Sequence, residues 1–223
     1  MRLLFIKILF WLPFFFHLEE IKSQDYPSHA ITNGVIMAKI YLPDSKDGFY
    51  RASRFDWSGI IYELKYNGVA YFGQWYSKHD PKVNDAICGP AEEFGEIGWY
   101  DKDNENFLKI GVGGLRKLQA EKYDKFKLYE VTNPGEWTIN RLENKIQFVH
   151  VVEDVSGYSY RYSKCIELVD NSPKLLIKHK LENIGKKLIR TNVYNHNFFM
   201  IGGLPTNSDI TVTFPKDVEE RIH

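Results

Sequence analysis

The segment spanning residues 189–202 holds the side chain best suited to proton transfer. It is rich in β-branched and aromatic residues, which predicts a β-strand, and His196 lies near its centre between Asn195 and Asn197. Because asparagine is depleted from strands, the Asn-His-Asn sequence breaks the local pattern, and such exceptions often mark functional sites. An imidazole, with an ordinary pKa of about 6.5, can donate or accept a proton near neutrality. His196 is therefore the first candidate for a catalytic residue.

Two other segments carry charged side chains that suit the binding of hydroxyl groups. Arg54 and Asp56 follow an aromatic stretch, and Glu92 and Glu93 follow a Gly-Pro-Ala turn. The guanidinium of an arginine offers a fixed fork of donors, and a carboxylate can accept a hydroxyl proton. Surface ion pairs and solvated loop acids are the competing interpretations, and the sequence alone leaves both open.

Several other chemistries find little support in the sequence. Cys88 and Cys165 form no metal-ligand cluster with a histidine at a usual spacing, so we predict no metal and no cofactor. The two thiols form a disulfide only if the fold brings them together, and two separate buried thiols fit equally well. The formal net charge of 0 and the sequence pI of about 7.1 give no nucleic-acid footprint.

The first 24 residues have the layout of a secretory signal peptide. A short basic lead precedes an apolar run at residues 8–18, and small and polar residues follow it. The apolar run is shorter than the about 20 residues that a membrane-spanning helix needs. We therefore expect an exported protein, periplasmic or extracellular, whose contact with a membrane would be through an uncleaved signal segment.

The remaining chain, residues 25–223, reads as one all-β domain. An Asn-Gly pair at residues 67–68 between two alternating runs predicts a β-hairpin, and no segment shows a long helical period. We expect residues 77–106 to be a long functional loop. The other alternating runs, separated by turn residues, predict strands at 30–41, 60–66, 69–75, 107–112, 127–131, 136–142, 145–155, 158–169 and 174–182.

The end of this strand series resembles the aldose 1-epimerases, or galactose mutarotases. The strand at 174–182, the turn Asn183-Ile184-Gly185 and the His196 strand are similar to the family's strand, Asn-x-Gly turn and histidine strand. Residues 50–59 and 89–95 look like a divergent branch of the same superfamily. The resemblance implies a β-supersandwich, a small sugar as ligand and His196 as the general acid. It would place Arg54, Asp56, Glu92, Glu93 and Asn195 around the sugar.

The chain also departs from the family pattern. It has no Asn-x-x-His-Gly-Gly segment, and it ends at His223, before the late strand that carries the family's catalytic glutamate. We therefore expect a fold that is incomplete at its C-terminus, with Glu92 or Glu93 as the base if there is one. A non-catalytic carbohydrate-binding protein, with sugars stacked on Trp57, Trp75 or Trp99, and an inactive fragment are the alternative hypotheses.

Overall fold

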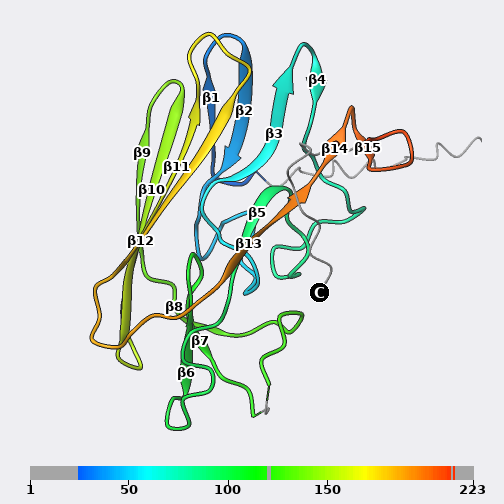
Figure 1. Cartoon of the computed structure of the whole chain (residues 1–223). Coiled ribbons are helices and arrows are strands. Elements are labelled where there is room, and N and C mark those ends of the chain that lie inside the picture. Colours follow the sequence, from blue (N-terminus) through cyan, green and yellow to red (C-terminus); the bar gives the residue numbers. More distant parts are fainter. Residues whose placement is uncertain (1–24, 120–121, 212, 214–223) are drawn as a thin grey trace, which may run out of the picture.

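The computed structural model describes residues 25–119, 122–211 and 213, and the predicted signal peptide lies outside them. Within this part of the chain every regular element is a β-strand, which confirms the all-β prediction (Figure 1). Among the described residues no helix is long and apolar enough to span a membrane.

The first antiparallel sheet has the order β1-β2-β3-β4. It contains β1 (Ser28–Thr32), β2 (Ile36–Tyr41), β3 (Ile60–Tyr66) and β4 (Val69–Ala70). The expectation of a single strand at 30–41 is wrong, because a turn separates β1 from β2. In this turn Gly34 has a φ of 80°, and Asn33 Oδ1 accepts hydrogen bonds from the backbone N–H groups that follow. The Asn67-Gly68 hairpin is confirmed, with φ of 49° and 78°, but its returning strand ends at Ala70 rather than at residue 75.

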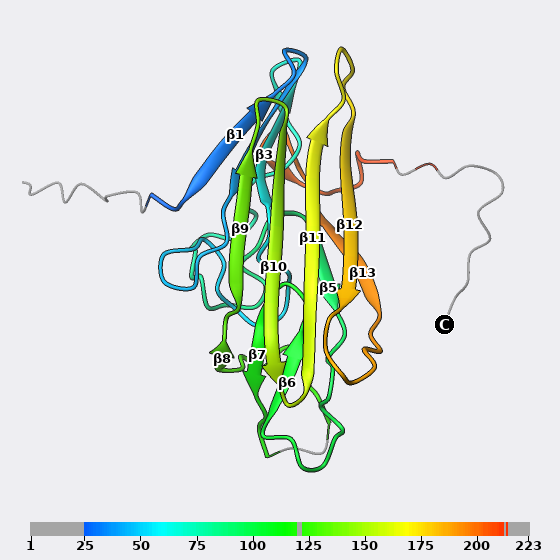
Figure 2. The ribbon, with the colours of Figure 1, turned by 90° about the vertical axis from the view of Figure 1, so that its left-hand side faces the viewer.

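The second four-stranded sheet has the order β12-β11-β10-β9. Its strands are β9 (Glu136–Arg141), β10 (Lys145–Val155), β11 (Tyr158–Leu168) and β12 (Leu175–Asn183), close to the predicted ranges. The two sheets form adjacent layers (Figure 2), and one apolar cluster joins Ile40 and Ile61 of the first sheet to Phe148 and Ile166 of the second. Burial of such side chains is the main favourable contribution to folding.

Three smaller sheets complete the fold. One contains β6 (Asn106–Lys109), β7 (Gly113–Arg116) and β8 (Val131–Asn133), so the expected strand at 127–131 is displaced toward the C-terminus. A hairpin of β14 (Met200–Ile201) and β15 (Leu204–Pro205) follows β13 (Val193–Phe198), which contains His196. The strand β13 pairs with β5 (Gly89–Phe94).

The strand β5 corrects the prediction of one continuous loop at residues 77–106. Its sequence, Gly-Pro-Ala-Glu-Glu-Phe, is poor in strand-forming residues, so local propensity did not indicate it. Antiparallel pairing with β13, about 100 residues later in the sequence, supplies the backbone hydrogen bonds instead. The two acidic residues and His196 therefore lie on neighbouring strands.

The side chains of β11 show which face of the second sheet is the core. Tyr158, Tyr160 and Tyr162 are all buried, so this tyrosine row is part of the core. Cys88 is buried, Cys165 is half-buried, and both are free thiols, as the interpretation of two separate cysteines predicted.

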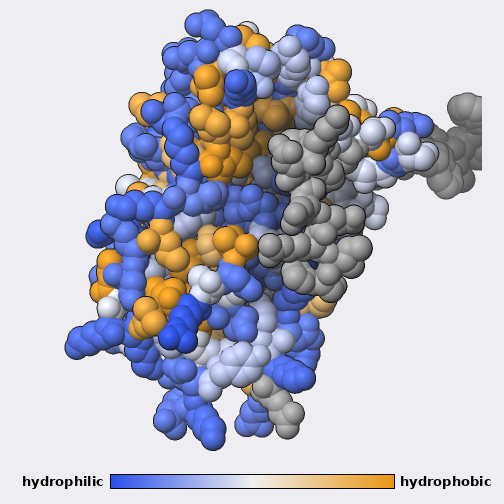
Figure 3. All heavy atoms as spheres, in the orientation of Figure 1, coloured by the Kyte–Doolittle hydropathy of each residue, from blue (hydrophilic) through white to orange (hydrophobic). Residues whose placement is uncertain are grey.

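One edge of the second sheet is open. The strand β12 is its last strand, and Leu181 on the core-facing side of β12 is 38% exposed. Apolar side chains reach the surface over the gap between β12 and the first sheet (Figure 3). Exposed edge strands with apolar side chains favour association with another chain.

His150 is a buried histidine with both ring nitrogens in use. Its Nε2 lies 2.8 Å from the Pro134 carbonyl oxygen and its Nδ1 lies 2.9 Å from the Tyr160 hydroxyl, while its ring stacks on Trp137. The neutral tautomer satisfies both contacts, because Nε2–H donates to Pro134 and Tyr160 donates to Nδ1. Burial lowers the pKa of His150 to about 4.

The free energy of unfolding should therefore fall as the pH drops from about 6.5 to 4. In this window the unfolded chain binds a proton at residue 150 and the folded chain does not, so stability falls by up to about 1.4 kcal/mol for each pH unit. Urea unfolding at several pH values measures this slope. In His150→Gln, whose amide can donate to Pro134 and accept from Tyr160, the slope should become shallower. An unchanged slope in that variant would contradict the assignment.

Candidate functional site

The pairing of β5 with β13 divides the predicted site residues between two faces. His196 lies opposite Ala91, Tyr194 opposite Glu93, and Asn195 opposite Glu92. In an antiparallel pair, opposite residues point to the same face and successive residues alternate. His196, Tyr194 and Glu93 therefore share one face. Asn195 and Glu92 occupy the other, so neighbouring residues in the sequence have different surroundings.

His196 is exposed and lies within a row of aromatic rings. It stacks on Phe198 at 4.0 Å between ring centroids, and Phe198 lies parallel to Trp75 at 5.6 Å. Trp75 is 45% exposed, whereas Trp57 and Trp99 are buried, so Trp75 is the one of these three tryptophans that a sugar could reach. Partial burial and the nearby positive charge of Arg54 hold the pKa of His196 below its ordinary value, which leaves the ring mostly neutral at pH 7.

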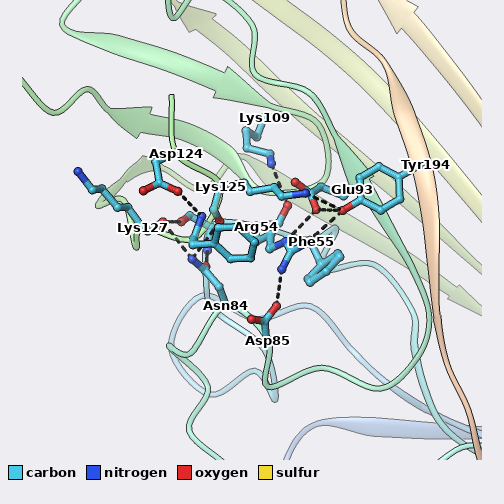
Figure 4. Close-up of polar contacts among 12 residues, drawn as sticks. Arg54, Phe55, Asn84, Asp85, Glu93, Lys109, Asp124, Lys125, Lys127 and Tyr194 are labelled. Carbon is cyan, nitrogen blue, oxygen red and sulfur yellow. Dashed lines mark hydrogen bonds and ion pairs between the residues drawn. The ribbon is translucent and has the colours of Figure 1, made fainter. Parts of the chain in front are cut away.

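Arg54 anchors the same face (Figure 4). Its Nε donates to Glu93 at 2.8 Å, its Nη2 donates to the Tyr194 hydroxyl at 3.1 Å, and its Nη1 pairs with Asp85. The Tyr194 hydroxyl in turn donates to Glu93. The guanidinium carbon lies 4.6 Å from the ring centroid of Phe55, the aromatic side chain that also contacts His196 with its ring edge-on. Arg54 and Glu93 are both buried, so this ion pair is rigidly held.

A buried lysine fixes the backbone of Arg54. Lys109 on β6 is fully buried, and its Nζ donates to the Arg54 carbonyl at 2.9 Å and to the Tyr123 hydroxyl at 3.1 Å. Burial lowers the pKa of Lys109 to about 8. Sequence reasoning did not identify this residue. The sequence signal that could have identified it is a lysine within the otherwise apolar segment Phe-Leu-Lys-Ile.

A hollow with a volume of about 430 Å³ opens beside this ion pair. Its lining includes Glu93 and Tyr194 together with Tyr123, Lys125 and Phe126. The volume is within the range of small-molecule sites, and the hollow has polar groups on several sides. His196 is outside its lining, so a ligand that touches both must extend from the hollow across the β13 surface.

The opposite face of β5 carries a buried ion-pair cluster. The Lys164 ammonium on β11 pairs with Glu92 and lies 3.5 Å from Asp56, and it donates to the Ser58 carbonyl at 2.9 Å. The Tyr162 hydroxyl donates to Asp56 at 2.9 Å. Glu92, Asp56 and Lys164 are each only 2% exposed, so all three charges are removed from solvent.

The electrostatics of this cluster indicate a structural role. Burial by itself raises the pKa of Glu92, but the positive charge of Lys164, with His179, brings the pKa down to about 2. Burial raises the pKa of Asp56 even though Lys164 opposes it. His179 on the open edge lies 3.3 Å from Glu92 Oε1 without the alignment of a hydrogen bond, so Oε1 has no hydrogen-bond partner among the described residues. Glu92 thus forms its ion pair with Lys164, and its side chain lies on the opposite face of the strand pair from His196.

In comparisons with known proteins, no family model, no curated protein and no solved structure matches this chain. Within the described part of the chain, no group of three or more histidine, cysteine, aspartate or glutamate side chains is arranged to hold a metal ion.

Replacing Lys164 by methionine should strongly destabilise the protein. The substitution leaves two buried carboxylates without their cation, which costs about 3–5 kcal/mol in comparable buried pairs. The free energy of unfolding from urea titration measures the effect. Lys178→Met is the matched control, because Lys178 of β12 pairs with Glu167 on the solvent side of β11 and its loss should change little. Equal stability of the two variants would contradict the assignment of the cluster.

Proposed function

We propose that this protein is aldose 1-epimerase-like, with a mutarotase-like fold, and that it binds a free aldose on the face of β13 that carries His196. The observation that carries the proposal is the register of β5 and β13, which places Glu93 and Tyr194 on the same face as His196. Arg54 joins them through its hydrogen bonds, and Trp75 supplies an exposed aromatic ring. A histidine, a carboxylate and an arginine beside aromatic rings suit the binding and ring opening of a sugar.

The proposed reaction moves two protons. His196 gives a proton to the ring oxygen as the bond from the anomeric carbon to that oxygen breaks, and a carboxylate takes the proton of the anomeric hydroxyl, which yields the open aldehyde. Rotation about the bond next to the aldehyde and the reverse proton transfers close the ring as the other anomer. Glu93 is the better candidate for the base than Glu92, because only Glu93 shares the face of His196. Arg54 would position Glu93 and the sugar hydroxyls.

A non-catalytic carbohydrate-binding protein is the second candidate function. The observation that favours it is the state of Glu93, which is 5% exposed and already accepts hydrogen bonds from Arg54 and Tyr194. A carboxylate held in this way is less available to take a proton from a substrate. The aromatic row and the hollow would then serve binding alone.

The cellular location of the protein is a further part of the proposal. The signal-like residues 1–24 favour export, so we propose that the protein meets its sugar in the periplasm or outside the cell.

Polarimetry of freshly dissolved α-glucose and α-galactose tests the catalytic proposal. The purified protein should speed the approach to anomeric equilibrium, and His196→Asn should lower this rate by about 10²-fold or more, the typical contribution of a general acid. Asn197→Ala is the matched control, because the neighbouring residue on β13 points to the opposite face and its loss should leave the rate unchanged. Sugar binding without acceleration would select the carbohydrate-binding alternative, and a folded protein that binds neither sugar would refute both.

The pH dependence of the rate tests the role of His196 separately. Because its pKa is lowered, few molecules carry the protonated ring at pH 7, and acidification from pH 7.5 toward 5.5 should raise the rate, corrected for the protein-free reaction. A rate that falls over the same range would assign His196 as the base instead of the acid.

A further inference from the structure

Trp75 is an exposed tryptophan that the structure holds in a fixed position. Its Nε1–H donates at 2.9 Å to the carbonyl of Ile87, two residues before β5, and its ring lies parallel to that of Phe198 on β13. Trp75 is nevertheless 45% exposed. An aromatic side chain that is already held in place can contact a ligand with little further loss of side-chain entropy, so the open part of this ring is well suited to binding.

Phe198 separates Trp75 from His196. The ring contacts of His196 in the described structure are with Phe55 and Phe198. Those of Trp75 are with Tyr76 and Phe198. Phe198 lies 4.0 Å from the His196 ring and 5.6 Å from the Trp75 ring, measured between ring centroids. The exposed tryptophan is therefore the second ring away from the histidine.

The hollow beside Glu93 lies toward the other end of β13. Tyr194, His196 and Phe198 follow one another on one face of this strand, and Tyr194 lines the hollow. At about 3.4 Å per residue, the Cα atoms of Tyr194 and Phe198 are about 13 Å apart, and Trp75 lies beyond Phe198. This span exceeds one pyranose ring. One monosaccharide bound between Glu93 and His196 thus leaves Trp75 uncovered.

We propose, as an extension that rests on the proposed function, that the bound aldose is the reducing unit of an oligosaccharide. The reducing unit would lie between Glu93 and His196, and the next unit would pass Phe198 and contact the ring of Trp75. A glycosidic bond to the next sugar leaves the hemiacetal of the reducing unit intact, so the same two proton transfers open and close it. Trp75 would then make the site selective for oligosaccharides over monosaccharides.

Isothermal titration calorimetry of the purified protein tests this selectivity with glucose and galactose and with maltose, cellobiose and lactose. Each disaccharide has a free reducing glucose unit, and the three differ in the linkage or in the second sugar. At least one should bind about tenfold more tightly than either monosaccharide, the scale of one aromatic contact. Trp75→Ala should lower the ratio of that disaccharide's affinity to the affinity for glucose toward one. Tyr100→Ala, which removes an exposed aromatic ring outside the lining of the hollow, should preserve the ratio.

Saturation-transfer NMR of the wild-type protein with the tightest disaccharide provides a second measurement that does not depend on the folding of a variant. Protons of both sugar units should receive saturation, and saturation confined to the reducing unit would overturn the inference. Equal affinity for the monosaccharides and all three disaccharides would also overturn it, as would an unchanged ratio in a folded Trp75→Ala protein. With glucose or galactose still bound, these results leave the proposed function standing. A folded protein that binds none of the sugars would refute both.

Discussion

The ion pairs of Lys164 with Glu92 and Asp56 are the interaction on which the candidate site depends. They join three segments that are far apart in the sequence: the turn after Arg54, the strand β5 and the strand β11. The Asp56 N–H donates to the Glu92 carbonyl, so the same contact also fixes the backbone. Burying three charges is costly unless each is paired. The positions of the turn after Arg54 and of β5 relative to Lys164 are therefore tightly constrained.

This constraint has a direct consequence for the face of β5 that carries Glu93. Because successive side chains of a strand alternate, fixing Glu92 toward Lys164 turns Glu93 to the other side, where it meets Arg54 and Tyr194. Two adjacent buried glutamates thus have different partners, Lys164 for Glu92 and Arg54 for Glu93. The buried cluster supports the site from behind, in the way that functional groups are generally held by a second layer of contacts.

The face that carries His196 combines a reachable histidine with a carboxylate that is held firmly. His196 and Trp75 are open to a ligand, whereas Glu93 is enclosed by its ion pair. The catalytic role proposed for Glu93 therefore requires a ligand that competes with Arg54 and Tyr194 for the carboxylate.

The sequence by itself determined the all-β class, the Asn67-Gly68 hairpin and the long strands β10, β11 and β12, because alternation of side chains and turn residues are local signals. It also indicated His196, Arg54, Asp56, Glu92, Glu93 and Asn195 as site candidates, but only the structure pairs Arg54 with Glu93 and places Asp56 and Glu92 in the buried cluster with Lys164. Only the tertiary structure decided that residues 89–94 form a strand, since that strand depends on a partner distant in the sequence. Lys164 occupies a core-facing position of β11 in phase with its buried tyrosines, a signal present in the sequence, but the carboxylates that neutralise it come from other segments. Pairing and charge compensation are non-local, and no local pattern encodes them.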